Sequence, residues 1–394
     1  MTSQELRSSG SLASIFALRM LGLFLILPVF AVYARHLPGG DNAFYVGLTI
    51  GIYGLTQSIL QIPFGMASDR YGRKAVILIG LAIFALGSFI AAFSGSIWGV
   101  MLGRALQGAG AISAAISALI ADSVREQVLT RSMAMVGASI GLTFALSLVI
   151  APPLTALWGV HGLFLLTGIL ALLAMFVVVY IVPNPTHHVS ETKELEQSHW
   201  SHVLFNPQLF KLNLGIFTLH AVQMALFVVV PTRLVKMGLP VMHHWYIYLP
   251  AVLVAFAVMV KPIMWAERQH KVTKLLRSAA LVLVITFGLF TYLMHSIWEI
   301  AFLMGLFFIG FNMMEATLPS LVSRCAPKRS KGLVLGIFNT TQSLGLFAGG
   351  AIGGLLSQHF PAEVVFLVAG FAMLIWLVIS RGLIEPTSAK PQNS

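Results

Sequence analysis

Residues 65–74 read GMASDRYGRK and separate two long apolar runs. Four of these ten residues are charged, Asp69, Arg70, Arg73 and Lys74, in a chain where charged residues are otherwise sparse. A short charged cluster between apolar runs is typical of a loop that joins two membrane-spanning helices. We call residues 65–74 the hinge, and the apolar runs on either side of it indicate what it joins.

The composition of the chain indicates a membrane protein. Of its 394 residues, 58% are hydrophobic and 9% are charged, whereas a soluble domain carries about 25% charged residues. A globular interior cannot bury so much apolar surface. Apolar stretches of about 20 residues recur along the chain, and each is long enough to cross a bilayer as a helix. The runs lack the alternation of barrel strands, so the sequence predicts an all-α membrane protein.

The apolar runs predict twelve spans. They cover residues 12–34, 44–67, 74–94, 96–121, 131–156, 161–182, 210–232, 244–267, 273–294, 296–322, 332–357 and 361–382. One connection, residues 183–209, is long and polar, and it separates six spans from six. The sequence thus predicts a six-helix bundle at 1–182, a linker at 183–209, a second six-helix bundle at 210–382 and a tail at 383–394.

The positions of lysine and arginine predict the orientation. If the N-terminus is cytoplasmic, eighteen of these residues lie on the inner side, and only Arg35, Arg233 and Lys236 lie on the outer side. Positive charge collects on the cytoplasmic side of membrane proteins. We therefore expect both termini and the linker in the cytoplasm. The net charge of +11 follows from the same loop residues, and without a continuous basic surface it predicts no nucleic-acid partner.

Short repeats relate the two halves. The tripeptide SIW occurs at 96–98 and again at 296–298, and IFALR at 15–19 returns as IFTLH at 216–220. QIPFGMASDR at 61–70 returns weakly as VKPIMWAER at 260–268. Three matches in the same order predict a parallel duplication. Two related six-helix halves with a site between them are a transporter architecture.

Within this framework the hinge resembles the signature loop of the major facilitator superfamily, G-x-x-x-D-R-x-G-R-K between spans two and three. RALQG at 104–108 resembles the fourth-span motif of that family. The matching residues are Gly65, Asp69, Arg70, Gly72, Arg73 and Lys74 in the loop, and Arg104, Gln107 and Gly108 in the fourth span. The resemblance covers residues 12–382 and implies the fold of that superfamily, with twelve transmembrane helices in two six-helix bundles.

Further stretches resemble one group within the superfamily. FALRMLG at 16–22 and NMMEATLPSL at 312–321 are similar to YajR-type transporters of bacterial inner membranes, in the drug:proton antiporter-like branch. YajR itself has an extra soluble C-terminal domain, and because this sequence ends twelve residues after its last predicted span, we expect no counterpart. The fifth span also departs from drug antiporters, because Ala145 and Ala151 stand where glycines are expected.

The charged hinge is interpreted as a conformational latch. A helix N-terminus carries a partial positive charge, so Asp69 would be attracted to the start of the span at 332–357. Asp122, at the inner end of span four, is a natural partner for Arg70 or Arg73. In the family such contacts imply a clasp that holds the halves together on the inner side when the site opens outward. The alternative is a solvated loop that only sets topology.

Ionisable residues inside spans are costly and therefore candidates for function. Glu315 lies well inside span ten, and a buried carboxyl can bind and release a proton near neutral pH. An ion pair with Lys261, at a similar depth on span eight, is the alternative role. His220 is a second proton-site candidate, or a packed hydrogen-bonding side chain. Arg19, its counterpart in span one, could meet an anionic substrate group or hold helix ends.

The remaining candidates are polar residues in spans. Arg104 is expected to organise span four within its own half. The predicted cavity-lining residues are Tyr53, Gln57, Gln223, Asn312, Asn339 and Gln342. The histidines in loops show no spacing for a metal site, and no nucleotide-binding motif or cofactor motif is present.

These observations predict a secondary active transporter of a small organic solute, in a bacterial inner membrane, that works by alternating access as a monomer. The resemblance favours proton-coupled efflux by antiport. Proton symport for uptake, a channel, or a non-transporting sensor on the same fold are the alternatives. An intramembrane enzyme is disfavoured, because Glu315, Lys261 and His220 form no recognised catalytic dyad.

Overall fold

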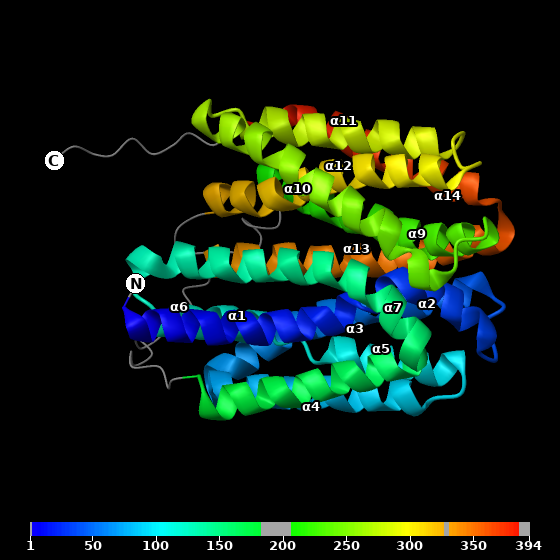
Figure 1. The fold of residues 1–394 in the computed structure, drawn as a ribbon. Helices are drawn as coiled ribbons and strands as arrows, with labels where there is room; N and C mark the ends of the chain where they lie inside the picture. Colours follow the sequence, from blue (N-terminus) through cyan, green and yellow to red (C-terminus); the bar gives the residue numbers. More distant parts are fainter. Residues whose placement is uncertain (1, 183–205, 327–330, 386–394) are drawn as a thin grey trace.

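The computed structural model describes residues 2–182, 206–326 and 331–385, and this part of the chain is helical (Figure 1). The helices of the first half are α1 (Ser3–Phe24), α2 (Leu27–Tyr33), α3 (Ala43–Tyr71), α4 (Arg73–Phe93), α5 (Ile97–Ala109), α6 (Ser113–Ser123) and α7 (Glu126–Tyr180), with a 3-10 turn η1 (Ala34–His36).

The second half is built in the same way. Its helices are α9 (Pro207–Lys236), α10 (Trp245–Arg268), α11 (Val272–Phe290), α12 (Ile297–Cys325), α13 (Lys331–His359) and α14 (Ala362–Ile379), with 3-10 turns η2 (Val241–His243) and η4 (Ser380–Gly382). The predicted linker and tail lie largely at 183–205 and 386–394, outside the described residues, so those boundaries stay predictions.

Among the described residues, ten helical segments are long and apolar enough to cross a membrane. One of them, Arg131–Tyr180, contains two predicted spans, because α7 bends back at Gly159, where φ is +66°. The predicted span at 332–357 corresponds to α13, which is not among the ten. Its centre is polar and lies inside the molecule, since α13 packs along both α3 and α9.

Two predicted spans are interrupted. The first is formed by α1 and α2, which are separated at Leu25 and Ile26, just before Pro28. It also begins earlier than predicted, because Thr2 and Glu5 form a capping box that starts the helix at Ser3. The fourth is formed by α5 and α6, separated by Gly110–Ile112. Proline and glycine are tolerated in such helices where neighbouring protein covers the freed backbone.

The SIW repeat marks equivalent helix starts. Ser96 precedes α5, and its hydroxyl accepts a hydrogen bond from the Gly99 N–H at 3.4 Å. Ser296 precedes α12 and accepts from the Glu299 N–H at 3.2 Å. Both caps have nearly the same extended backbone, with φ of −143° and −136°. The repeated SIW sequence therefore forms the same helix cap in both halves.

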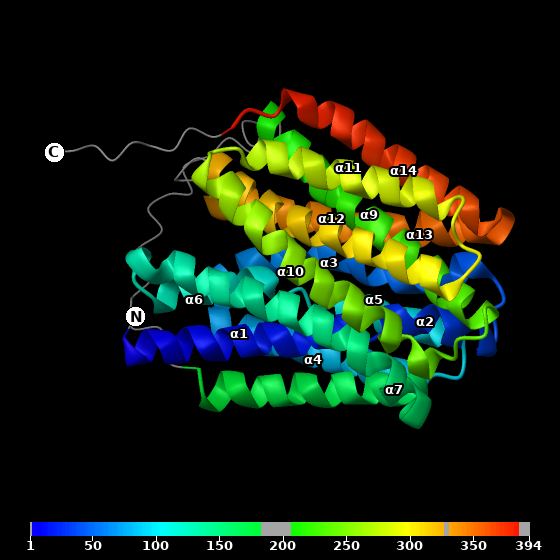
Figure 2. The same cartoon turned by 45° about the horizontal axis from the view of Figure 1, so that its top comes forward.

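The two halves meet through α13, which lies between α9 and α3 in the middle of the molecule (Figures 1 and 2). A Cβ atom on Gly350 would lie 2.5 Å from the Gly47 carbonyl oxygen, and one on Gly354 would lie 2.6 Å from that of Ala43. A Cβ on Gly353 would lie 2.9 Å from the Cα of Ala225 on α9. Small residues thus allow α13 to approach helices of both halves at backbone distance.

These contacts lie at one end of the molecule. We call the end where the chain begins the terminal end, and the opposite end, where α3 begins and α13 finishes, the distal end (Figure 1). At the distal end the Ala43 N–H donates to Gln358 Oε1 at 2.6 Å, and α2 contacts α9. Within the described ranges this hydrogen bond is the one that joins the two halves. The halves are therefore held together at the distal end.

Candidate functional site

Three helices of the second half bring His220, Gln342 and Glu315 together. His220 on α9 and Gln342 on α13 have side-chain nitrogens 2.8 Å apart, Nε2 to Nε2. The same Gln342 nitrogen lies 3.4 Å from Glu315 Oε1 on α12. His220 Nε2 is 3.7 Å from Glu315 Oε2. Two residues predicted as proton-site candidates and one predicted cavity-lining residue therefore form one polar cluster.

The hydrogen bonds define the proton positions in this cluster. His220 Nδ1 lies 3.2 Å from the Ile216 carbonyl oxygen, and a carbonyl oxygen only accepts, so Nδ1 carries the hydrogen. In the neutral ring Nε2 is then an acceptor, and the Gln342 amide must present its NH₂ group to it. The second amide hydrogen points to Glu315. Gln342 therefore donates to both neighbours and links them.

Aromatic side chains border the cluster. The ring of Phe311 on α12 lies 5.8 Å from the His220 ring and 6.1 Å from the ring of Phe144 on α7. Phe144 also lies 6.1 Å from Phe308, so apolar rings from both halves meet here. The side chain of His220 is 7% exposed, and that of Glu315 is 35% exposed. Glu315 is thus more exposed than His220, although its Oε2 atom is buried and has no hydrogen-bond partner.

The first half contributes two buried arginines. Arg19 on α1 donates from Nη1 to Ser113 Oγ at 2.8 Å. Arg104 on α5 donates from Nη1 to Gln107 Oε1 at 2.9 Å and lies over the Tyr53 ring at 4.9 Å. Both arginines are at most 1% exposed. Arg104 thus contacts α3 from α5, and its role in organising its own half stays a prediction.

The fourth-span motif forms a hydrogen-bonded network. Gln107 donates from Nε2 to Ser88 Oγ at 2.8 Å on α4 and is 3.5 Å from Thr167 Oγ1 on α7. Gly108 packs against the Tyr53 carbonyl, and no larger residue fits there. The motif therefore connects α3, α4, α5 and α7, which stabilises the first half as a unit.

The charged hinge folds around Arg73. Gly72, with φ of +94°, ends α3 and starts α4. Arg73 forms ion pairs with Asp69 and, at 3.0 Å from Nε to Oδ2, with Asp122. Lys74 donates to the Val182 carbonyl at 2.6 Å. Asp122 thus pairs with Arg73, one of the two arginines that were predicted as its partner.

The other residues of the predicted latch have different surroundings in the described part of the chain. Asp69 is 61% exposed, and among the described residues it makes no hydrogen bond or ion pair with α13. Arg70 lies over the ring of Tyr71 at 5.4 Å. A Cβ on Gly65 would contact Ala114 of α6 at 3.4 Å, within the same half. The predicted contact of Asp69 is with the start of α13, where residues 327–330 and the side chains at 331 and 332 lie outside the described part of the chain. The clasp therefore stays a prediction.

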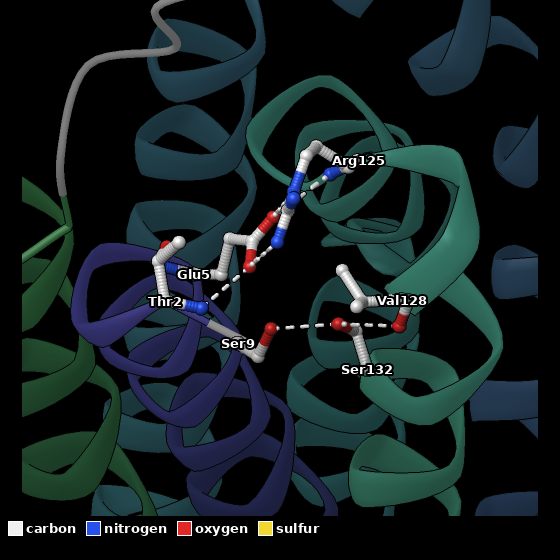
Figure 3. A network of polar contacts seen from close by, with 6 residues as sticks. All are labelled: Thr2, Glu5, Ser9, Arg125, Val128 and Ser132. Carbon is white, nitrogen blue, oxygen red and sulfur yellow. Dashed lines mark hydrogen bonds and ion pairs between the residues drawn. The ribbon is translucent and has the colours of Figure 1, made fainter.

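A further ion pair, which the sequence did not predict, lies at the terminal end (Figure 3). Arg125, between α6 and α7, donates to Glu5 of α1 from Nε at 2.7 Å and from Nη2 at 3.2 Å. The side-chain hydrogen bond to Glu5 raises the pKa of Arg125, so the guanidinium stays charged. Ser9 donates to Ser132 at 2.8 Å close by. The S/T-x-x-E capping pattern at 2–5 was the available signal.

The remaining candidates occupy separate places. Lys261 is exposed on α10 and, in the part of the chain that the structure covers, forms no ion pair with Glu315. Gln57 and Gln223 are buried, and Asn312 and Asn339 are half-buried. No group of three or more His, Cys, Asp or Glu side chains that could hold a metal ion occurs among the described residues.

Comparison with known proteins agrees with this architecture. The family model of the Major Facilitator Superfamily matches residues 12–350 and 264–394. The chain belongs to the major facilitator superfamily. It is 42% identical, over 387 residues, to the inner membrane transport protein YajR of Escherichia coli, covering 98% of this chain and 85% of YajR. The superfamily assignment confirms the predicted fold and identifies a transporter, not an enzyme.

More distant members of the superfamily are also similar. The class B tetracycline resistance protein of Escherichia coli is 30% identical over 181 residues, 44% of each chain. A solved bacterial homologue of the human lysosomal transporter Spinster, in an inward-facing and occupied conformation, has a TM-score of 0.76 at 12% identity, covering 99% of this chain and 100% of that chain. The multiple apolar helices and the similarity to YajR support a multi-pass inner-membrane protein.

Proposed function

We propose that this transporter exports a small organic solute in exchange for protons by alternating access, with both termini in the cytoplasm. The observation that carries the proposal is the cluster of Glu315, Gln342 and His220. It holds the carboxylate and the imidazole that face each other inside the membrane-spanning part. Ionisable pairs at such depth are typical of proton relays in transporters.

The cluster offers a defined proton step. Glu315 is the more exposed of the two ionisable groups, so we expect it to be the group that exchanges a proton with the transport pathway. When His220 takes the proton on Nε2, that nitrogen becomes a donor and faces the NH₂ group of Gln342. The amide then has to turn, and the new N–H can approach Glu315 Oε2, which is 3.7 Å away. Protonation therefore changes the hydrogen bonds of Gln342.

Gln342 is placed to pass this change to the contact between the halves. It lies on α13, the helix that packs on α9 of its own half and on α3 of the other half. Moving α13 is a direct way to open the distal contact. In the same cycle, we expect a clasp between Asp69 and the start of α13 to engage at the terminal end when the distal end separates.

Similarity to resistance proteins supports the efflux direction. The class B tetracycline resistance protein and the quinolone resistance protein NorA of Staphylococcus aureus are named for drug resistance. The positive charges on the hinge, and on the connections at the same end, support cytoplasmic placement of that end. A monomer is sufficient, because one chain supplies both halves.

The function is tested with purified protein in proteoliposomes. We expect a pH gradient to drive the movement of a solute from a panel that includes tetracycline, a quinolone and benzoate, with protons moving in the opposite direction. A pH-sensitive dye reports the proton movement. Protons and solute moving together would indicate symport, and solute binding without flux would indicate a sensor.

Asp69→Asn tests the clasp. The substitution keeps the size of the side chain but removes the charge that pairs with Arg73 and would engage the start of α13. We expect transport to fall by roughly 5- to 150-fold, the range for a conformational coupling of about 1–3 kcal/mol, with normal membrane insertion. Asp41→Asn, an exposed aspartate outside the hinge, serves as the control. Full activity in Asp69→Asn counts against the clasp.

A further inference from the structure

The interruption of the fourth span leaves backbone donors without partners inside the membrane-spanning part. The helix α6 begins at Ser113, and its N-cap residue Ile112 has no side chain that can cap it. The first backbone bond of the helix runs from the Ile116 N–H to Ile112. The N–H groups of Ser113, Ala114 and Ala115 have no acceptor among the described residues. This helix start lies about 15 Å from the terminal end of α6.

Arg19 points at this helix start. Its Nη1 donates to Ser113 Oγ at 2.8 Å, whereas Nε and Nη2 have no hydrogen-bond partner. The side chain is 1% exposed, and no carboxylate of the described residues pairs with it. The Tyr53 ring lies 5.9 Å away, and its buried hydroxyl also has no partner. A buried cation with free donors is costly unless an anion joins it.

Arg104 in the same half has more partners than Arg19, although its Nε also has no hydrogen-bond partner. It donates to Gln107 and, at 3.4 Å, to the Ile50 carbonyl, and the Tyr53 ring lies 4.9 Å from its guanidinium. Arg19 makes one hydrogen bond and has the more distant ring contact. The two arginines are equally buried, so the difference lies in their partners. Arg19 thus has unused capacity to bind an anion.

We propose that Arg19 and the N-terminus of α6 bind a carboxylate group and that the transported solute is an organic acid. The guanidinium presents paired N–H groups that match the two oxygens of a carboxylate. Helix N-termini attract anions through the same orphan N–H groups, and interrupted helices of transporters use them for anionic substrate groups. That the bound anion is the transported solute rests on the proposed function. Anion binding at Arg19 and α6 does not depend on it.

The site is tested by thermal unfolding of the detergent-purified protein, without any flux measurement. Acetate and benzoate are compared with the uncharged acetamide and benzamide, and with chloride, at constant ionic strength. We expect the carboxylates to raise the unfolding temperature of the wild type and of Arg35→Gln, a substitution of an exposed arginine in the turn η1 that follows the first span. The rise is expected to disappear in Arg19→Gln. Equal effects of acid and amide, or of chloride and acetate, overturn the proposal.

A second measurement separates a binding role from a structural one. Without added carboxylate, Arg19→Met removes an uncompensated buried charge, so we expect the unfolding temperature to rise by a few degrees. Arg104→Met removes satisfied hydrogen bonds, and we expect the unfolding temperature to fall. A fall in Arg19→Met like that in Arg104→Met shows a structural arginine and overturns the proposal. If the wild type binds carboxylates but shows no flux driven by the pH gradient, proton coupling is refuted and the binding site is not.

Discussion

Glu315→Gln is expected to reduce transport driven by a pH gradient to the background of empty vesicles, while the protein still inserts and folds. The amide has the size of the carboxyl but cannot bind or release a proton. It can still accept a hydrogen bond from Gln342, which now lies 3.4 Å from Glu315 Oε1. The packing of α12 against α9 and α13 is therefore retained, and only the proton chemistry is lost.

Exchange experiments distinguish the role of Glu315. Solute exchange at equal pH on both sides requires alternating access but no net proton movement, so we expect Glu315→Gln to retain it. Glu363→Gln, in the first turn of α14, changes another acid of the same half and should leave both activities intact. Gradient-driven transport that persists in Glu315→Gln would show that the proton is carried elsewhere.

Gln342→Leu tests the connection between the proton and α13. Leucine fills a similar volume but cannot donate to His220 or to Glu315. We expect the acid to keep binding protons, while solute flux no longer follows the pH gradient. The measurement is the number of protons moved per solute, which should fall below that of the wild type. An unchanged ratio would exclude Gln342 from coupling.

The sequence predicted the depth of the polar residues but not their neighbours. Glu315 and Lys261 lie at similar depths, which made an ion pair between them a reasonable alternative. Depth follows from counting residues along a helix, whereas the direction of a side chain depends on which helices surround it. Lys261 is exposed on α10, and Glu315 instead faces His220 and Gln342 from α9 and α13. Which side chains become neighbours therefore depends on how the helices pack, and the pattern along one helix does not determine it.

The break in span four escaped prediction for a different reason. Residues 96–121 are apolar enough to be read as one helix. In the structure, Gly110 packs against Gly80 on α4, and α6 restarts at Ser113. Ser113 was not selected because a lone serine in an apolar span carries no pattern. By contrast, the signature loop and the SIW repeat could be recognised from the sequence, because each is defined by the order and spacing of residues close together in the chain.

The second large effect is expected from Gly350→Leu, which should separate the halves at the distal end. Even a Cβ at this position lies 2.5 Å from the Gly47 carbonyl oxygen and 2.9 Å from the Gly51 nitrogen. These are backbone atoms of α3, so they cannot move aside as a flexible side chain would. Overpacking of this kind costs about 1–3 kcal/mol, which corresponds to a population shift of about 5- to 150-fold. The cost falls on the state closed at the distal end.

Cysteine labelling measures that shift. Cys325 is the single cysteine of the chain, so Ser343→Cys in a Cys325→Ser background places one thiol at the α3–α13 contact, where Ser343 is 3% exposed. We expect faster maleimide labelling and lower transport in Gly350→Leu, with a smaller effect in Gly350→Ala. Gly336→Leu is the matched control, because a Cβ at Gly336 on the same helix meets nothing within 4 Å. Equal labelling in Gly350→Leu and Gly336→Leu would show that the glycine contact does not hold the distal end closed.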